Sequence, residues 1–148
     1  FSVGAILALA HDVLITLGIV VLLQGFMPFS LEINQPMIAA FLTIVGYSIN
    51  DTVVVFDRIR ENLNKYKSET YETLINKSIN ETLSRTTITS LTTIFVVTVL
   101  FLFGGESLKS FTFSLLIGLI VGTYSSVVIA SNIALELHER YYKKELQR

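Results

Sequence analysis

The sequence predicts an all-α membrane protein with four transmembrane helices. Hydrophobic residues make up 51% of the 148 residues and charged residues only 16%, whereas a soluble domain has about 45–50% apolar and about 25% charged residues. The apolar residues gather in four runs, each close to the length of about 20 residues that crosses a bilayer as a helix. These runs are continuous rather than alternating, which excludes strands, because only helices or closed barrels satisfy the backbone in lipid.

We expect the four helices to form one membrane domain that covers residues 1–148. Their approximate spans are residues 1–27, 37–56, 86–103 and 111–135. Pro28 and Pro36 interrupt the chain between the first two spans, and Gly104 with Gly105 predicts a tight turn between the last two. Because the chain starts inside an apolar run without Met, we interpret it as a fragment or a processed form. No basic segment of the kind found in signal peptides precedes that run.

Basic residues are distributed unevenly between the ends of the predicted helices. Ten of the eleven Lys and Arg residues lie in the connector of residues 57–85 or in the tail of residues 136–148, and the exception is Lys109. By the positive-inside rule, the connector and the tail are cytoplasmic. Apolar residues recur at helical spacing within the connector, which predicts an amphipathic helix or a helical pair on the membrane surface or against the bundle. The alternative is a solvated, charged connector.

Composition and motifs exclude several functional classes. The chain has no Cys, so it has no disulfides and no Cys-ligated metal site, and its net charge of −1 argues against nucleic acid as a partner. It contains no P-loop, HExxH or GxSxG motif. Two intramembrane Asp residues could form an aspartyl protease site, but neither stands in a Tyr-Asp or Gly-x-Gly-Asp context. We therefore expect no enzymatic activity, no cofactor and no metal.

Asp51 is the main candidate for a functional residue. It lies inside the second apolar run, and a carboxylate in hydrocarbon costs a few kcal/mol, so it normally faces a bundle interior and marks a functional path. Helical spacing places Tyr47 and Ser48 on the same face as Asp51, and Asn50 is its neighbour in the chain. These side chains favour a proton-carrying site, and the alternative is an Asp that snorkels or only bonds to another helix.

Arg85 opens the third span and is followed by a segment rich in hydroxyl groups. Helical spacing aligns it with Thr89 and Thr92 on one face. The adjacent face carries the hydroxyl groups of Thr86, Ser90 and Thr93. Because the second and third helices run in opposite directions, Arg85 could face Asp51 and hold it ionised until a proton arrives. The alternative is an Arg that snorkels and anchors the helix end.

A second intramembrane carboxylate, Asp12, lies in the first span beside His11. His11 could titrate near neutral pH. The two residues either join the network around Asp51 or orient a neighbouring helix, and spacing alone leaves both interpretations open.

The fourth span has a stripe of small residues that includes Gly118 and Gly122 in a GxxxG arrangement. Small residues allow another backbone to approach closely. We therefore expect these two glycines to serve helix packing.

Three segments of the chain resemble the SecD/SecF family of bacterial protein-export membrane proteins. They are AHDVL at residues 10–14, GYSINDTVVVFDRIREN at residues 46–62 and SINETLSRT at residues 78–86. The resemblance extends over essentially the whole chain and is closest to the SecF half of the family. It matches the last four of six helices, without the first two helices and the extracytoplasmic domain that the family carries.

The resemblance implies a fold and a function that the residues alone do not give. The family is similar in architecture to the RND (resistance–nodulation–division) transporters, so the chain would be one half of a pseudo-symmetric bundle in the bacterial inner membrane. Proton flow through that region is thought to drive late stages of preprotein translocation. The positions of Asp51 and Arg85 are implicated in proton transport. The resemblance assigns no defined role to Asp12.

The resemblance also implies partners. These are SecD, the SecYEG translocon with the accessory subunits YajC and YidC, membrane lipid, and a preprotein that would be contacted through the extracytoplasmic domain. Two other functions remain as alternatives. One is a different RND-type proton-coupled transporter, and the other is a purely structural membrane subunit whose buried charges only fix helix register.

Overall fold

A computed structural model describes residues 2–136 of the chain, and the predicted tail beyond them lies outside the described residues. The described part is helical with short connections. Its elements are α1 (Ser2–Leu23), α2 (Gln35–Lys65), α3 (Tyr71–Phe103), α4 (Glu106–Tyr124) and the π-helix η1 (Ser125–Ile129). Helix α4 continues through η1 without a break, so that a single helical rod runs over Glu106–Glu136.

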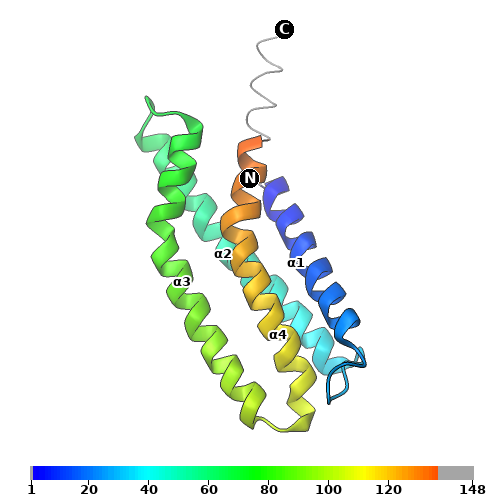
Figure 1. Ribbon diagram of the computed structural model, residues 1–148. Helices are drawn as coiled ribbons and strands as arrows, with labels where there is room; N and C mark the ends of the chain where they lie inside the picture. Colours follow the sequence, from blue (N-terminus) through cyan, green and yellow to red (C-terminus); the bar gives the residue numbers. More distant parts are fainter. Residues whose placement is uncertain (1, 137–148) are drawn as a thin grey trace.

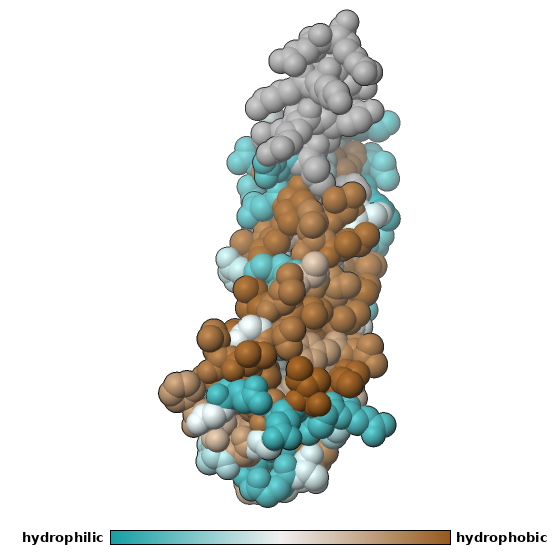
Figure 2. Space-filling view, turned by 90° about the vertical axis from the view of Figure 1, so that its right-hand side faces the viewer, coloured by the Kyte–Doolittle hydropathy of each residue, from teal (hydrophilic) through white to brown (hydrophobic). Residues whose placement is uncertain are grey.

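Helices α2 and α4 pack against each other at the centre of the bundle, and α1 and α3 lie on opposite sides of this pair (Figure 1). The start of α1 and the turn between α2 and α3 lie at one end, which we call the hairpin end. The other two connections lie at the opposite end, which we call the loop end. All four helices are long and apolar enough to cross a membrane. Figure 2 shows a broad apolar band between hydrophilic ends. The predicted all-α fold is confirmed.

The helices do not end where the apolar runs end. Helix α2 continues nine residues beyond the predicted limit to Lys65, and α3 begins at Tyr71 rather than near residue 86. The predicted connector is therefore not a separate element, because its residues extend α2 and α3 into a helical hairpin with a turn at residues 66–70. Charged residues mark the point where a helix leaves lipid, but Arg, Glu, Leu and Lys all favour helix, so nothing stops the helix there.

Capping residues set the helix boundaries that the apolar runs miss. Asn34 accepts a hydrogen bond from the Met37 amide at 3.0 Å before α2, and Thr70 accepts one from the Thr73 amide at 3.3 Å before α3. Such caps satisfy amide groups that have no partner in the first turn of a helix. Between α3 and α4, Gly105 has a φ of 80°, a left-handed conformation that glycine adopts without strain.

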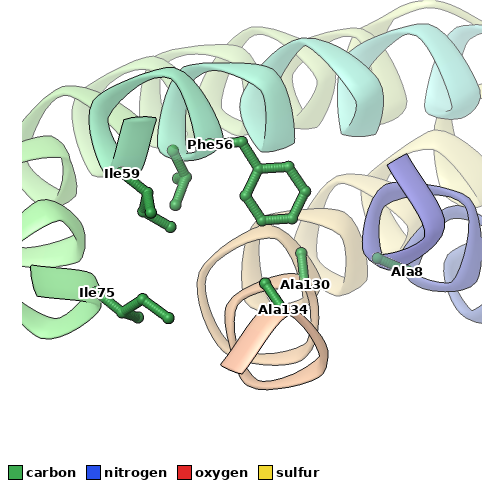
Figure 3. Close-up of a cluster of buried hydrophobic side chains, with 7 residues drawn as sticks. Ala8, Phe56, Ile59, Ile75, Ala130 and Ala134 are labelled. Carbon is green, nitrogen blue, oxygen red and sulfur yellow. The ribbon is translucent and has the colours of Figure 1, made fainter. Parts of the chain in front are cut away.

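Apolar clusters close both ends of the bundle interior. At the hairpin end, side chains from α1, α2, α3 and the last part of the α4 rod meet around Phe56 and Ile59 (Figure 3). At the loop end, Val20, Leu31 and Met37 are almost fully buried. The polar residues of the interior therefore lie between two apolar layers.

The helical hairpin is held by polar contacts between α2 and α3. The Asn62 amide donates to Ser78 Oγ and to Glu81 Oε2, both at 2.8 Å. The Arg58 guanidinium donates to Glu81 at 2.7 Å and also binds Glu61. The hydrogen bond from Asn62 and the charge of Arg58 lower the pKa of Glu81. This hairpin lies beyond the apolar part of both helices.

Helix α4 approaches α2 most closely at Gly118. A Cβ atom at this position would collide with the side chain of Ile44. At Gly122, one turn further along α4, a Cβ atom would lie 3.6 Å from Ser48 Cβ and 3.7 Å from Asp12 Oδ2, which are ordinary van der Waals distances. Both glycines thus lie at the same helix contact, but a Cβ atom can be accommodated at Gly122 and not at Gly118.

Candidate functional site

The inward face of α2 carries a run of residues spaced for a helix. Ile44, Ser48, Asp51 and Val55 are each at most 6% exposed. The outer two are apolar and the inner two are polar, so that two polar side chains are held between two apolar ones on the face that meets α4. The spacing of four, three and four residues explains why all of them point inward.

Asp51 contacts the α4 rod at its irregular part. Ser126 Oγ lies 3.3 Å from Asp51 Oδ2 and 3.0 Å from the carbonyl of Thr123, so its one hydroxyl proton is shared between two acceptors. Ser126 belongs to the π-helix η1. A single π-helical turn within an α-helix is frequent at functional sites. Here it brings the adjacent hydroxyls of Ser125 and Ser126 into the buried interior.

Helix α3 places a buried hydroxyl next to Asp51. Thr86 is 1% exposed, and its hydroxyl lies close to the Asp51 carboxyl without completing a hydrogen bond. Thr86 belongs to a stripe in which every fourth residue of α3 has a buried hydroxyl group. The members of this stripe are Ser78, Thr82, Thr86 and Ser90.

Arg85 does not pair with Asp51. Its side chain is exposed, it forms no ion pair within residues 2–136, and it lines a cleft on the surface of the hairpin. Arg85 nevertheless directly precedes Thr86, whose side chain is buried on the inward side of α3. The structure thus places the two predicted relay residues near each other but not in contact.

Asp12 lies at a junction of three helices. It is fully buried in the middle of α1, and Ser48 Oγ of α2 donates to its Oδ2 at 2.5 Å. The half-buried ring of His11 has its Nδ1 atom 3.2 Å from Asp12 Oδ1. Gly122 of α4 covers the third side. Asp12 and Ser48, which the sequence treats as members of a possible network, are therefore brought together.

Tyr47 joins a separate hydroxyl cluster between α2, α3 and α4. Its hydroxyl donates to Ser90 Oγ at 3.0 Å, and Thr123 Oγ1 donates to the same atom at 2.9 Å. Tyr47 and Ser48 are thus both drawn inward, but they bond to different helices.

The structure leaves two candidate residues outside the interior. Asn50 is exposed on α2, and the exposed Thr89 side chain donates to the carbonyls of Arg85 and Thr86. The sequence grouped Thr89 with Arg85 as one face, and that face of α3 points outward. Sequence reasoning did not identify Ser126 and Thr123. Their spacing of four residues and one residue from Gly122 is the pattern that could have indicated them.

The fold and the site define a multi-pass helical membrane protein that holds two carboxyl groups inside a four-helix bundle. The sequence profile described as "Protein export membrane protein SecD/SecF, C-terminal" matches residues 1–140. The chain belongs to this family.

Similar sequences carry one name. The chain is 62% identical over 140 residues to the "Protein translocase subunit SecF" of Rhodothermus marinus and 53% identical over 145 residues to that of Petrotoga mobilis. These alignments cover 95% and 98% of the chain but 46% of each relative. The chain therefore spans about half the length of the curated relatives it matches.

Solved structures show the same arrangement of helices. A crystal structure of SecDF in a "super-membrane-facing form" matches with a TM-score of 0.89 at 46% identity, over 98% of this chain and 19% of that one. The structure of SecDF from Thermus thermophilus, titled a translocon-associated membrane protein, matches with a TM-score of 0.83 at 47% identity, over 94% of this chain and 18% of that one.

Proposed function

We propose that this chain is the proton-conducting part of a SecF subunit, which couples proton flow across the membrane to late stages of preprotein translocation. The observation that carries the proposal is the environment of Asp51. A carboxyl group that is 6% exposed lies at membrane depth beside a π-helix, a shared hydroxyl proton and a buried hydroxyl without a partner. Such a group can accept and release a proton without moving a helix.

The surroundings of Asp51 favour exchange over a purely structural role. Buried polar groups that only hold helices together are normally saturated with hydrogen bonds. Among the described residues, Asp51 accepts one hydrogen bond, of 3.3 Å, from a hydroxyl that it shares with a carbonyl, and the Thr86 hydroxyl lies close by. In this proposal Asp51 carries the proton and Arg85 is the nearby cation that favours its release.

We infer that a pseudo-symmetric partner, SecD, covers the outer face of α2 and α3. Asn50 and Thr89 are exposed on that face at membrane depth, where lipid offers no hydrogen bonds and intramembrane polar groups normally face other protein. The relatives' names and the SecDF structures support this partner. The translocon SecYEG, YajC, YidC and the preprotein would be reached through parts of the complex outside this chain.

The proposal includes the orientation in the bacterial inner membrane. The hairpin end carries the basic residues of the segment 57–85, and the loop end carries Lys109. By the positive-inside rule the hairpin end faces the cytoplasm.

The test is made in the complete SecD–SecF complex. Asp51→Asn and Arg85→Lys are compared with the unaltered complex for preprotein export and for proton conductance in proteoliposomes. The proposal expects both activities to fall together while the complex still assembles. Unchanged conductance and export in a normally assembled Asp51→Asn complex would support the structural subunit instead. Loss of conductance with full export would point to another RND-type transport function.

A further inference from the structure

A polar cleft opens between α2 and α3 on the hairpin. It has a volume of about 280 Å³ and is lined by Asp57 and Glu61 from α2 and by Thr82 and Arg85 from α3. Val54, one turn from Asp51, forms part of its inner wall. The cleft therefore lies among charged residues, about one helical turn from Asp51 along α2.

The hydroxyl stripe of α3 continues from this cleft into the bundle. Thr82 lines the cleft, and Thr86 lies four residues further, about 6 Å along the helix axis. The Thr86 hydroxyl is buried, lacks a hydrogen-bond partner within residues 2–136, and lies close to Asp51. An ordered water needs two to four polar partners, and the Thr86 hydroxyl and the Asp51 carboxyl supply them.

The two arginines at the cleft differ in whether they form ion pairs. Arg58 is engaged by Glu61 and Glu81. Arg85 lines the cleft and has no ion pair within the described part of the chain. A free cation between the opening and a carboxyl repels an approaching hydronium ion and stabilises the deprotonated carboxyl. Arg85 thus stands where it can control proton passage in and out of the cleft.

The other side of α2 offers no comparable route. A smaller cleft of about 160 Å³ between α1 and α2 also has charged residues, Asp57 and Arg60, in its lining, but the rest of its wall is Ser2 and the apolar residues Ala5, Val53 and Phe56. Phe56 belongs to the apolar cluster that closes the hairpin end of the interior (Figure 3). Its ring offers no hydrogen bond toward Asp51.

We propose that the α2–α3 cleft is the aqueous entrance through which Asp51 exchanges protons, with the hydroxyl groups of Thr82 and Thr86 as the steps between them. Each hydroxyl accepts a proton from the water on one side and releases its own on the other, so no charge stays on the threonines. For this step the Thr82 hydroxyl turns away from the carbonyls of Ser78 and Ile79, to which it donates in the structure. Asp51 alone gains or loses the proton. This inference rests on the proposed function and names the route to its site.

The first test measures water access without any transport. Because the chain has no Cys, single variants Val54→Cys and Thr82→Cys can be made in an otherwise cysteine-free complex. A charged methanethiosulfonate is added from the hairpin side of inverted membrane vesicles. Both thiols should react at least about tenfold faster than that of Leu83→Cys, since only hydrated thiols ionise to the reactive thiolate. Leu83 is the matched control because it is exposed at the same depth but lines an apolar groove. Equal rates at all three positions would overturn the proposal.

The second test measures proton flux. Thr86→Val should lower conductance several-fold and Thr86→Ser should restore it, whereas Thr98→Val, three turns further along the same helix, should change nothing, because the Thr98 hydroxyl only donates to the Ile94 carbonyl. Modification of Thr82→Cys should block conductance. If Asp51→Asn abolishes conductance but these changes do not, the cleft is not the route although the relay stands. If Asp51→Asn has no effect, the proposed function fails, whatever the labelling rates are.

Discussion

The bundle holds two buried aspartates whose surroundings differ in almost every respect. Asp12 lies where three helices meet, accepts a hydrogen bond of 2.5 Å from Ser48 and is fully enclosed. Asp51 lies one turn along α2 from Ser48, beside a π-helix, and accepts a longer hydrogen bond of 3.3 Å from Ser126. Two residues of one chemical type are thus held tightly in one place and loosely in the other.

The difference shows how burial alone misleads as a sign of function. Both carboxyls are at most 6% exposed. The Asp12 junction has good hydrogen-bond geometry and close helix contacts, which resist change. The Asp51 site has an unpartnered hydroxyl, a shared proton and a neighbouring cation, which allow the carboxyl to change its protonation and its partners. We expect the first site to maintain structure and the second to exchange protons.

The largest expected effect separates the two sites by activity. Asp51→Asn should lower proton conductance of the complete complex by on the order of tenfold or more, because a positioned proton-transfer group contributes about 10²–10⁴-fold. Asp12→Asn keeps the size and the acceptor oxygen that Ser48 uses, and most of the conductance should remain. Conductance in proteoliposomes under an imposed pH gradient measures both. Equal losses would show that the two carboxyls act as one relay.

The second prediction concerns how tightly the Asp12 side is packed. Gly118→Ala should lower the stability of the complex by about 1–3 kcal/mol, the usual cost of overpacking, because the new methyl group collides with Ile44. Gly122→Ala, one turn away, meets only ordinary contact distances and should cost less. Thermal unfolding in detergent measures the order of the two variants.

The control for this pair is Gly18→Ala. No atom lies within 4 Å of a Cβ at Gly18, and alanine favours helix more than glycine, so this variant should not lose stability. An equal loss in Gly118→Ala and Gly122→Ala would contradict the difference in tolerance between the two contacts.

The third prediction measures the bond that fixes Asp12. Asp12→Ala leaves the Ser48 hydroxyl buried without its partner, which typically costs about 1–3 kcal/mol. Adding Ser48→Ala should recover part of this loss, and a double-mutant cycle on the free energy of unfolding gives the coupling between the two side chains. Thr16→Val is the control, since the Thr16 hydroxyl is buried and has no hydrogen-bond partner among residues 2–136, so that its removal should cost little. Additive losses would mean that the 2.5 Å contact contributes nothing.

The smallest expected effect concerns the hairpin into which the Asp51 side opens. The hydrogen bond from Asn62 and the charge of Arg58 lower the pKa of Glu81 below the ordinary value of 4.5 for a glutamate. The stabilisation from this carboxylate is therefore complete above about pH 4.5 and decreases as the pH falls from there through the lowered pKa. Amide exchange in the hairpin, corrected for its intrinsic pH dependence, should increase modestly on this acidification.

Glu81→Gln should make hairpin protection independent of pH in that window. Glu72→Gln is the matched control, because Glu72 is an exposed acid on the same helix, and the pH dependence should persist in it. If acidification increased amide exchange around Asp12 and not in the hairpin, the expected difference between the two sides would be wrong.

The number of helices and the inward face of α2 could be predicted because apolar runs and helical spacing are local properties. The outward position of Thr89 could not, because α3 has hydroxyl groups on both faces and only packing against α2 and α4 selects Thr86 and Ser90. The length of α2 was underestimated because hydropathy reports the limit of the lipid, whereas helix propensity and the Asn62 contacts carry the helix on to Lys65.

The partner of Asp51 was hidden for another reason. Uniform helical spacing places Ser125 and Asn132 on the stripe of Gly118 and Gly122, but the structure buries Ser126 and exposes Asn132. The π-helix lies between the two regular segments and shifts the phase of the residues after it. No residue type in the sequence predicts the position of such a turn.

The π-helix makes the site sensitive to the deletion of a single residue. It accommodates one residue more in a turn than an α-helix does, so deletion of one codon within Ser125–Ile129 would restore regular winding. The residues after the deletion would then rotate by about 100° relative to those before it. Asn132 would take the buried position of Ser131, and Ile133 the exposed position of Asn132. Deletion of Ser126 itself would both restore regular winding and remove the hydroxyl that contacts Asp51.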